Sequence, residues 1–456
     1  MGDGRGAALG SQRVNAALRA AVVSALFVCL AQRAGADTVS QPPPSSSSSV
    51  ERAAAPSERI TAYRLSPDLY RRAHFLGRLR FAASVIGVLY GVFVPWLLLR
   101  RRWSAKLRDL GEAAFRSRVL QGFLYVPLLA AAIGVLVLPL DVLEEAMLKH
   151  YGISVQPWPS WIGDWTKAQL LTVVLGTLLA SLLYAILRRG VRHWWLVFWL
   201  ASLPVLLAVF FLEPVLIDPM FNRFEPLSDK APDLIPDLQR VVRRAGMEIP
   251  PQRMFWMEAS DKTIVPNAYV TGFGASRRIV VWDTTIAQET RDGLLTVFGH
   301  ELGHYVLGHV WKGLAVMSAT GLVLLYLVHR TVLWLLDRCG PAWGVRGLDD
   351  WASLPALLLL LSLFGFFAAV LGNAYSRFQE HQADVFGFEV THGIVEDPGQ
   401  AAALSYQRFG EKALVDPEPN PIDALLFFDH PDVASRVRFF VTYDPWSKGE
   451  EPRFVK

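Results

Sequence analysis

The sequence predicts a mainly α-helical, polytopic membrane protein with an additional folded domain, made of helices and a small β-sheet, that is assembled from two chain segments. Hydrophobic residues make up 52% of the 456 residues and charged residues only 19%, a balance unlike that of soluble domains. Six apolar runs have about the length needed to cross a bilayer. A long region between the fourth and fifth runs has a strand-like pattern instead.

The first 58 residues contain no predicted domain. Residues 1–36 begin with scattered arginines, continue with an apolar stretch at 20–31 and end in Ala34-Gly35-Ala36. This pattern is typical of a secretory signal peptide, and a first membrane helix is the alternative. Residues 37–58 contain three consecutive prolines and five consecutive serines. Such a stretch cannot bury a core, so we predict a disordered Pro/Ser linker.

Two groups of apolar runs are predicted to span the membrane. Residues 59–214 form an N-terminal membrane domain with four spans, and residues 312–375 add two more. Prolines inside the runs do not exclude helices, because packed membrane helices tolerate them. The six runs are 81–99, 120–140, 168–187, 194–212, 313–336 and 353–375.

The remaining segments are predicted to fold together as one domain. Residues 215–311 are far too long for a connecting loop and contain three stretches rich in strand-forming side chains, with glycines as turn signals. Residues 376–456 form the second piece of the domain. The two spans between the pieces can be antiparallel neighbours in space. The predicted strands lie at 253–258, 268–273 and 278–284.

Two histidines in the first piece form half of a predicted zinc site. Residues 296–307 are apolar and helix-compatible, and they contain the motif H-E-x-x-H. Residues four apart lie on one face of a helix, so His300 and His304 would present two imidazoles to one metal ion. Glu301 would be free to reach a metal-bound water as general base. The alternative is two helix histidines that happen to be four residues apart.

The second piece supplies the third predicted ligand. A catalytic zinc has three protein ligands and one open position, and Glu380 completes the set as His, His and Glu. The competing pattern H-E-x-x-H-x-x-G-x-x-H fails in register, because Leu307 and Val310 occupy the required positions. We therefore predict one Zn²⁺ per chain, bound by His300, His304 and Glu380.

Arginine and lysine counts in short loops predict the orientation in the membrane. The loops after the first and third spans are basic, whereas the stretch 141–167 between them begins with acidic residues. The basic loops are predicted to be cytoplasmic, and the zinc domain then lies on the opposite face. In a bacterium this would be an inner-membrane protein with an extracytoplasmic catalytic side. The basic residues are Arg100, Arg101, Arg102, Lys106, Arg108, Arg116, Arg118, Arg188, Arg189 and Arg192.

Charge and cysteine content argue against a nucleic-acid-binding protein and against a disulfide-rich protein. The formal net charge is only +4, and the basic residues are spread over loops between apolar runs, so no nucleic-acid partner is predicted. The chain has two cysteines, Cys29 and Cys339, which do not form a disulfide framework.

Six motifs in order resemble those of the integral-membrane zinc endopeptidases that include the type I CAAX prenyl endopeptidase. These enzymes are gluzincins, with H-E-x-x-H and a downstream glutamate, and the resemblance covers residues 63–441. It runs through D-P-M-F-N-R-F-E-P-L at 218–227, N-A-Y at 267–269, R-I-V-V-W-D-T at 278–284, H-E-L-G-H at 300–304, S-R-F-Q-E-H-Q-A-D at 376–384 with Asn373 ahead of it, and H-P at 430–431 with Arg436.

The resemblance implies roles for residues that the spacing alone does not assign. Asp384 would orient a zinc imidazole at the catalytic site, and His430 would face the reacting carbonyl. Asn267 and Ala268 would pair with the substrate backbone. Each has a plainer alternative: an ion pair of Asp384 with Arg436, a capped turn at His430, and an ordinary buried strand at the Asn-Ala pair.

The expected function is that of a membrane-embedded zinc endopeptidase with Glu301 as general base on a metal-activated water, resembling the CAAX prenyl endopeptidase. Its partners would be the bilayer and a peptide or protein substrate, lipidated or membrane-associated by resemblance. One alternative keeps the chemistry and changes the substrate to misfolded membrane or envelope proteins. A second alternative is a transporter or scaffold without hydrolysis, against which the intact His, Glu, His and Glu set argues.

Overall fold

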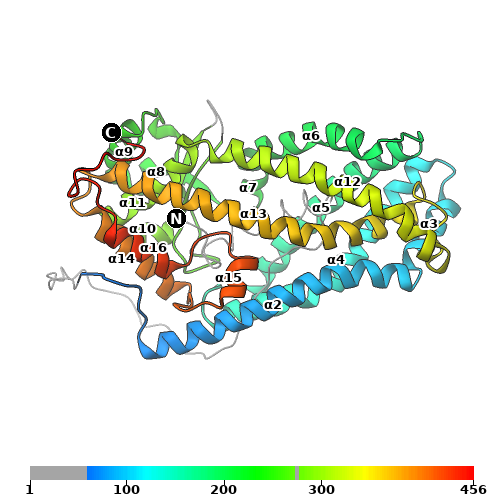
Figure 1. Cartoon of the computed structure of the whole chain (residues 1–456), viewed down its shortest axis with the longest axis horizontal. Coiled ribbons are helices and arrows are strands. Elements are labelled where there is room, and N and C mark those ends of the chain that lie inside the picture. Colours follow the sequence, from blue (N-terminus) through cyan, green and yellow to red (C-terminus); the bar gives the residue numbers. More distant parts are fainter. Residues whose placement is uncertain (1–58, 273–276, 456) are drawn as a thin grey trace.

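The computed structural model describes residues 59–272 and 277–455. The predicted signal peptide and Pro/Ser linker therefore lie outside the described residues. Figure 1 shows an elongated molecule in which long helices run along the long axis, while shorter helices and a sheet gather at one end. This is the architecture predicted from the sequence, a helical membrane bundle with an added domain.

Six candidate membrane spans are present among the described residues, which confirms the six predicted spans. Five of the span helices extend beyond their apolar runs into polar residues, and the fourth, which coincides with the run at 194–212, is continued by a π-helix and a short α-helix. The span helices are α2 (Pro67–Arg100), α4 (Arg118–His150), α5 (Trp158–Leu187), α6 (Trp194–Leu212) with a π-helix (Glu213–Ile217) and α7 (Asp218–Phe221), α12 (His309–Trp343), and α13 (Leu354–Thr391) after a 3₁₀ turn (Trp351–Ser353).

Two span helices reach out of the bundle and form part of the second domain. Ala73 and Leu76 near the start of α2 are fully buried in one core with Phe409 and Val437 from the end of the chain. Helix α13 is continuous over 38 residues. The boundary predicted between 375 and 376 therefore falls inside one helix, and the span itself presents the second half of the candidate site.

The second domain combines short helices with a sheet. Apolar side chains from both chain segments fill its core, including Leu302 from the first segment and Phe386 from the second. Its helices are α8 (Leu227–Lys230), α9 (Ile235–Arg244), α10 (Asp283–Gln288), α11 (Arg291–Val306), α14 (Pro398–Lys412), α15 (Pro421–Phe427) and α16 (Val433–Thr442), with 3₁₀ turns at Pro232–Leu234 and Pro251–Arg253.

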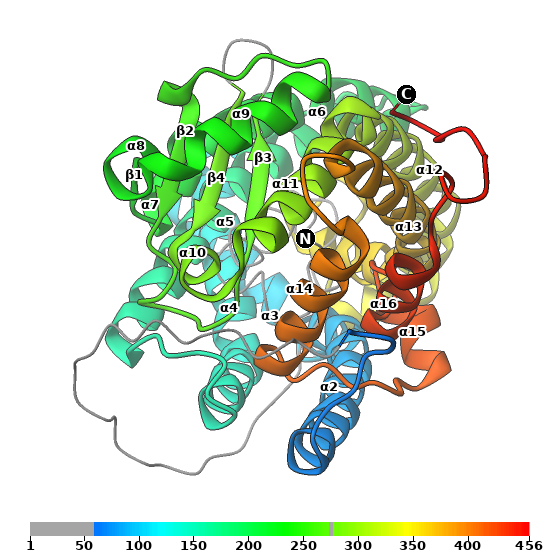
Figure 2. The ribbon, with the colours of Figure 1, turned by 90° about the vertical axis from the view of Figure 1, so that its left-hand side faces the viewer.

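The sheet has four strands in the order β1-β2-β4-β3. Strands β2 and β4 are parallel, and the two outer pairings are antiparallel. Figure 2 shows β3, at one edge of this sheet, beside α11. Three strands fall within the stretches predicted from the sequence, and β1 is an addition. The strands are β1 (Phe224–Pro226), β2 (Met254–Met257), β3 (Ala268–Thr271) and β4 (Arg278–Trp282).

The predicted cytoplasmic loops meet at the end of the bundle far from the sheet, where α3 (Trp103–Ala114) lies across the helix ends. The hydroxyl of Ser104 donates to the carbonyl of Ala352 at 2.9 Å. The Trp351 indole donates to the carbonyl of Arg118 at 3.3 Å, and the Arg188 guanidinium lies 4.5 Å from the centre of a Trp351 ring. Both arginine-rich loops therefore occupy one face of the molecule.

Candidate metal centre

Helix α11 carries the H-E-x-x-H motif through the middle of the second domain. The hydroxyl of Thr290 accepts a hydrogen bond from the Gly293 nitrogen at 3.1 Å, a typical N-cap. Helices α13 and α14 and strand β3 all contact α11, so most of the helix is buried. His300 and His304 lie one turn apart, with their Nε2 atoms 3.1 Å from each other.

Glu380 on α13 joins the two histidines. Its Oε2 atom lies 3.3 Å from Nε2 of His300, and its Oε1 atom lies 3.2 Å from Nε2 of His304. One donor atom from each residue lies within 4.8 Å of the others, a grouping that could hold a metal ion. His300 and Glu380 are 80 positions apart in the sequence, and they meet here because α11 and α13 cross at this point.

Glycines allow this crossing. A Cβ atom placed on Gly387 of α13 would lie 2.7 Å from the backbone nitrogen of His300. A Cβ atom on Gly299 of α11 would lie 3.0 Å from the carbonyl oxygen of Gly387. Backbone atoms cannot yield as the end of a side chain can. The two helices therefore approach to a distance that only glycine permits, and this distance places Glu380 against His300.

We expect Gly387→Ala to destabilise the protein by about 1–3 kcal/mol and to weaken metal retention, because the added methyl group would push α13 away from His300. Thermal unfolding and metal analysis of the purified protein measure these two effects. Gly372→Ala on the same helix is the matched control, since a Cβ there meets no atom within 4 Å. Equal stability of the two variants would contradict the close contact.

Asp384 lies one turn beyond Glu380 and contacts the back of His300. Its Oδ1 atom is 2.9 Å from Nδ1 of His300, and its Oδ2 atom accepts from Nε of Arg436 at 3.0 Å. Burial lowers the pKa of Arg436, but Asp384 raises it above the ordinary value, so the guanidinium stays charged. The orienting contact and the ion pair, offered as alternatives from the sequence, occur together in one carboxylate.

Tyr406 on α14 closes this buried cluster. Its hydroxyl lies 3.4 Å from Oδ1 of Asp384, and the Arg436 guanidinium lies 4.4 Å from its ring centre. Burial raises the pKa of Tyr406 well above its ordinary value, so the hydroxyl keeps its proton and acts as a donor. No sequence pattern points to Tyr406, because only the packing of α14 on α11 brings it here.

His430 reaches the same carboxylate from the loop between α15 and α16. Its Nε2 atom is 3.0 Å from Oε1 of Glu380, and its Nδ1 atom is 2.9 Å from Oδ1 of Asp429. Burial disfavours the imidazolium, whereas Glu380 and Asp429 raise the pKa of His430 above its ordinary value. His430 therefore lies beside the candidate metal ligands.

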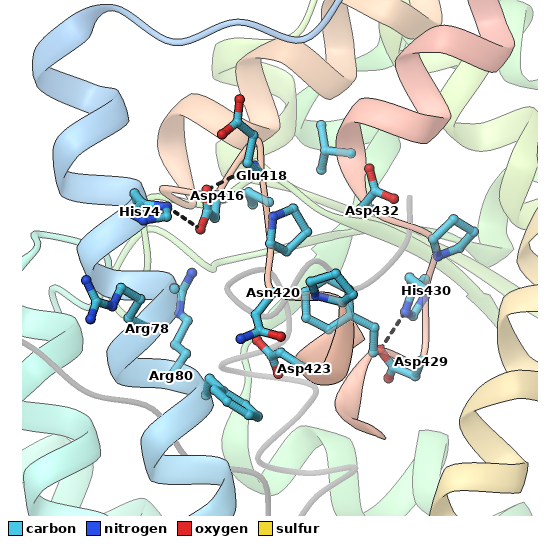
Figure 3. Close-up of a pocket in the computed structure, with 18 residues that line it drawn as sticks. His74, Arg78, Arg80, Asp416, Glu418, Asn420, Asp423, Asp429, His430 and Asp432 are labelled. Carbon is cyan, nitrogen blue, oxygen red and sulfur yellow. Dashed lines mark hydrogen bonds and ion pairs between the residues drawn. The ribbon is translucent and has the colours of Figure 1, made fainter. Parts of the chain in front are cut away.

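A cavity of about 580 Å³ opens next to His430. Figure 3 shows His430 and Asp429 on one side of this cavity and residues of α2, including His74 and Arg80, on the other. In the wall of this cavity, Nδ1 of His74 lies 3.0 Å from Oδ2 of Asp416. The cavity reaches His430 and is bounded by helix α2 and by residues 415–433 of the second chain segment.

The other predicted site residues lie on the first chain segment. Glu301 follows His300 on α11 and is partly exposed, whereas His300 is 3% exposed. Asn267 is buried and precedes β3; Thr285 contacts its backbone nitrogen and its carbonyl oxygen through one hydroxyl, at 2.6 and 2.5 Å. The Ala268 nitrogen donates to Oδ1 of Asn267 at 2.8 Å. The start of β3 is thereby held rigidly at the edge of the sheet.

His309 is an unexpected neighbour of the site. It is the first residue of α12, after Gly308 turns the chain with a φ of 69°. Its Nδ1 atom lies 3.1 Å from Nδ1 of His304, and its Nε2 atom lies 3.2 Å from Oε1 of Gln382. His309 therefore packs against the Nδ1 side of His304, whereas Glu380 faces its Nε2 atom.

A bundle of membrane spans joined to a buried His, His and Glu group on crossing helices defines a class of membrane-embedded metallopeptidase. Comparisons with known proteins agree with this class. Residues 228–443 match the model of peptidase family M48, and residues 49–223 match a model described as the CAAX prenyl protease N-terminal region with five membrane helices.

Relatives and a solved structure narrow the assignment. An uncharacterized metalloprotease, YhfN of Bacillus subtilis, is 33% identical over 77% of this chain and 81% of its own. A CAAX prenyl protease 1 homolog of Arabidopsis thaliana is 26% identical over 63% of this chain and 66% of its own. The crystal structure of S. mikatae Ste24p superposes with a TM-score of 0.69 at 19% identity, covering 83% of this chain and 90% of that one.

The chain belongs to peptidase family M48. It is an integral, multi-pass membrane metalloendopeptidase, as the sequence predicted, and its substrate is a peptide or protein. The predicted resemblance to the CAAX prenyl endopeptidase family and the mainly helical fold are both confirmed.

Proposed function

We propose that the metal is zinc, bound by His300, His304 and Glu380. Two imidazoles and one carboxylate are a donor set that catalytic zinc sites use, with a fourth position left for water. Glu380 supports this fit, because its carboxylate is buried and faces both histidines, while its Oε2 atom makes no hydrogen bond within the described part of the chain. The Arg436 guanidinium, 3.3 Å from Oε2, offsets part of the cost of burying this charge, and a metal ion shared with the histidines would offset more of it.

The other residues prepare this set. Asp384 holds Nδ1 of His300 at 2.9 Å, which leaves the lone pair of Nε2 directed away from Asp384 and available for a metal. Arg436 and Tyr406 fix Asp384 in turn, so His300 keeps one tautomer and one orientation. Asp384 and Arg436 act here as positioning residues.

Zinc in such a set supplies Lewis acidity to a water molecule and to a substrate carbonyl. In the proposed reaction, Glu301 accepts the proton of that water and returns it to the leaving amine. His430 donates a hydrogen bond to the oxyanion that develops from the carbonyl. The backbone of Asn267 and Ala268 at the edge of the sheet pairs with the substrate chain, as an added strand does.

The substrate proposed first is a C-terminal CAAX-type peptide carrying a lipid, because several relatives are CAAX prenyl proteases by name. A quality-control role on membrane or envelope proteins is the second candidate, and the charge bias favours it. The arginine-rich loops gather at the end of the bundle opposite the sheet, and positive residues mark the cytoplasmic face. The catalytic domain would then lie outside the cytoplasm.

One assay separates these candidates. Purified protein is incubated with a CAAX peptide in prenylated and unprenylated forms, and with an unfolded membrane protein, before and after chelation and zinc restoration. Cleavage restored by zinc supports the endopeptidase, and failure to cleave any of the three substrates contradicts it. Preference for the prenylated peptide selects the first candidate.

A separate experiment tests the orientation in the membrane. A tag is attached at Lys456, and protease is added outside sealed cells. Digestion of the tag supports the extracytoplasmic placement of the catalytic domain, and protection of the tag would refute it.

A further inference from the structure

The segment from Asp218 to Asn222 joins the fourth span to the sheet, and the proposed reaction does not use it. Helix α6 passes through the π-helix and into α7, which begins at Asp218. Asp218 is only 3% exposed at this junction. A buried carboxylate is costly unless hydrogen bonds compensate it, so the partners of Asp218 show what the position is for.

Both carboxylate oxygens of Asp218 accept hydrogen bonds. Oδ2 accepts from the hydroxyl of Tyr269 at 2.7 Å and from Nη2 of Arg278 at 2.9 Å. Oδ1 accepts from Nδ2 of Asn222 at 2.9 Å. Tyr269 belongs to β3 and Arg278 to its neighbour β4. One buried side chain therefore holds two adjacent strands to the end of a membrane span.

A second span is tied to the same segment. Lys167 of α5 donates to the carbonyl of Met220 at 2.8 Å. Lys262, in the loop before β3, donates to the carbonyl of Phe221 and forms an ion pair with Asp164 of α5 at 2.8 Å. Helix α7 is thus anchored to the bundle, and the contacts of Asp218 extend that anchorage to the edge of the sheet.

We propose that Asp218 is a positioning residue that fixes the edge strand β3 for substrate pairing through the hydroxyl of Tyr269. The inference rests on the proposed function, in which Asn267 and Ala268 at the start of β3 pair with the substrate backbone. Tyr269 is the next residue, so a hydrogen bond that fixes it also fixes those backbone groups. The named partners of Asp218 lie outside α11 and α13, and loss of this bond leaves Glu380 in place.

Two variants of graded severity test the inference. Tyr269→Phe removes the hydroxyl that donates to Asp218, and Asp218→Ala removes the carboxylate that accepts this hydrogen bond. For a peptide long enough to pair along β3, we expect each variant to raise KM about tenfold with kcat unchanged, the effect of one lost hydrogen bond. A short peptide that ends close to the scissile bond should keep its KM, and zinc content should stay constant.

The matched control is Tyr443→Phe, which removes a hydroxyl that donates to the buried Glu389 at 2.6 Å, on the α16 side of the domain. It should leave both KM values unchanged. Adding Tyr269→Phe to Asp218→Ala should raise KM no further, because the tyrosine hydroxyl has then already lost its acceptor. No rise in KM with Tyr269→Phe, or an equal rise for both peptides, overturns the inference. Failure of the proposed function itself looks different, since the wild-type protein would then cleave neither peptide.

Discussion

Replacing Glu301 by glutamine is expected to lower kcat/KM for peptide hydrolysis by about 10²- to 10⁴-fold and to leave the zinc content unchanged. The amide is close to the carboxylate in size but cannot accept the proton of an attacking water. Glu301 is partly exposed, whereas His300 and Glu380 are buried at 3% and 4% exposure. The substitution is therefore expected to remove the proposed base without disturbing the buried candidate ligands.

Glu248→Gln is a suitable control for Glu301→Gln, because Glu248 is exposed in the loop after α9. It should keep full activity and full zinc content. Initial rates with a fluorogenic peptide and metal analysis of the same preparations give both readouts. Substantial hydrolysis by zinc-loaded Glu301→Gln would show that another group accepts the proton, and the assignment of Glu301 would fail.

The sequence predicts the parts of this protein that depend on local chemistry. Hydropathy locates all six spans, because a run of about 20 apolar residues has few alternatives to crossing a bilayer. The four-residue spacing of His300 and His304 places them on one helical face. Three of the strands were found through their side-chain pattern. Glu380 could be named because a zinc site needs a third ligand and its motif follows a span.

Features that depend on contacts between distant segments could not be predicted in this way. Strand β1 has only three residues, too few to show a strand pattern in the sequence. It forms because β2 pairs with it. Nothing in the sequence distinguishes Gly387 from other helical glycines, because its close approach to His300 exists only in the folded structure. No sequence pattern marks Tyr406, and the motif that begins at Asp218 does not reveal the buried contacts of its carboxylate, since the partners of both residues lie on other elements. The continuity of α13 was hidden because the sequence becomes polar where the helix leaves the membrane.

Replacing Glu380 by glutamine is expected to abolish stoichiometric zinc binding and, with it, hydrolysis. The amide oxygen is neutral and a weaker ligand for Zn²⁺ than a carboxylate. Its loss of charge has a further effect, because Nη1 of Arg436 lies 3.3 Å from Oε2 of Glu380. Without the carboxylate, a buried guanidinium would stand close to the metal position and repel the cation. We therefore expect a larger loss of zinc affinity than removal of one ligand would cause.

Glu389→Gln separates this effect from general damage to α13. Glu389 lies nine residues further along the same helix, is fully buried, and accepts hydrogen bonds from Tyr443 and from the nitrogens of residues 453–455. Its replacement should lower thermal stability, because a buried acceptor is weakened, yet leave zinc content intact. If Glu389→Gln lost zinc as completely as Glu380→Gln, the loss of zinc would reflect damage to helix α13 and would not identify Glu380 as a ligand. If only Glu380→Gln loses zinc, the Glu380 carboxylate must bind the same ion as His300 and His304, although two membrane spans separate these residues in the sequence.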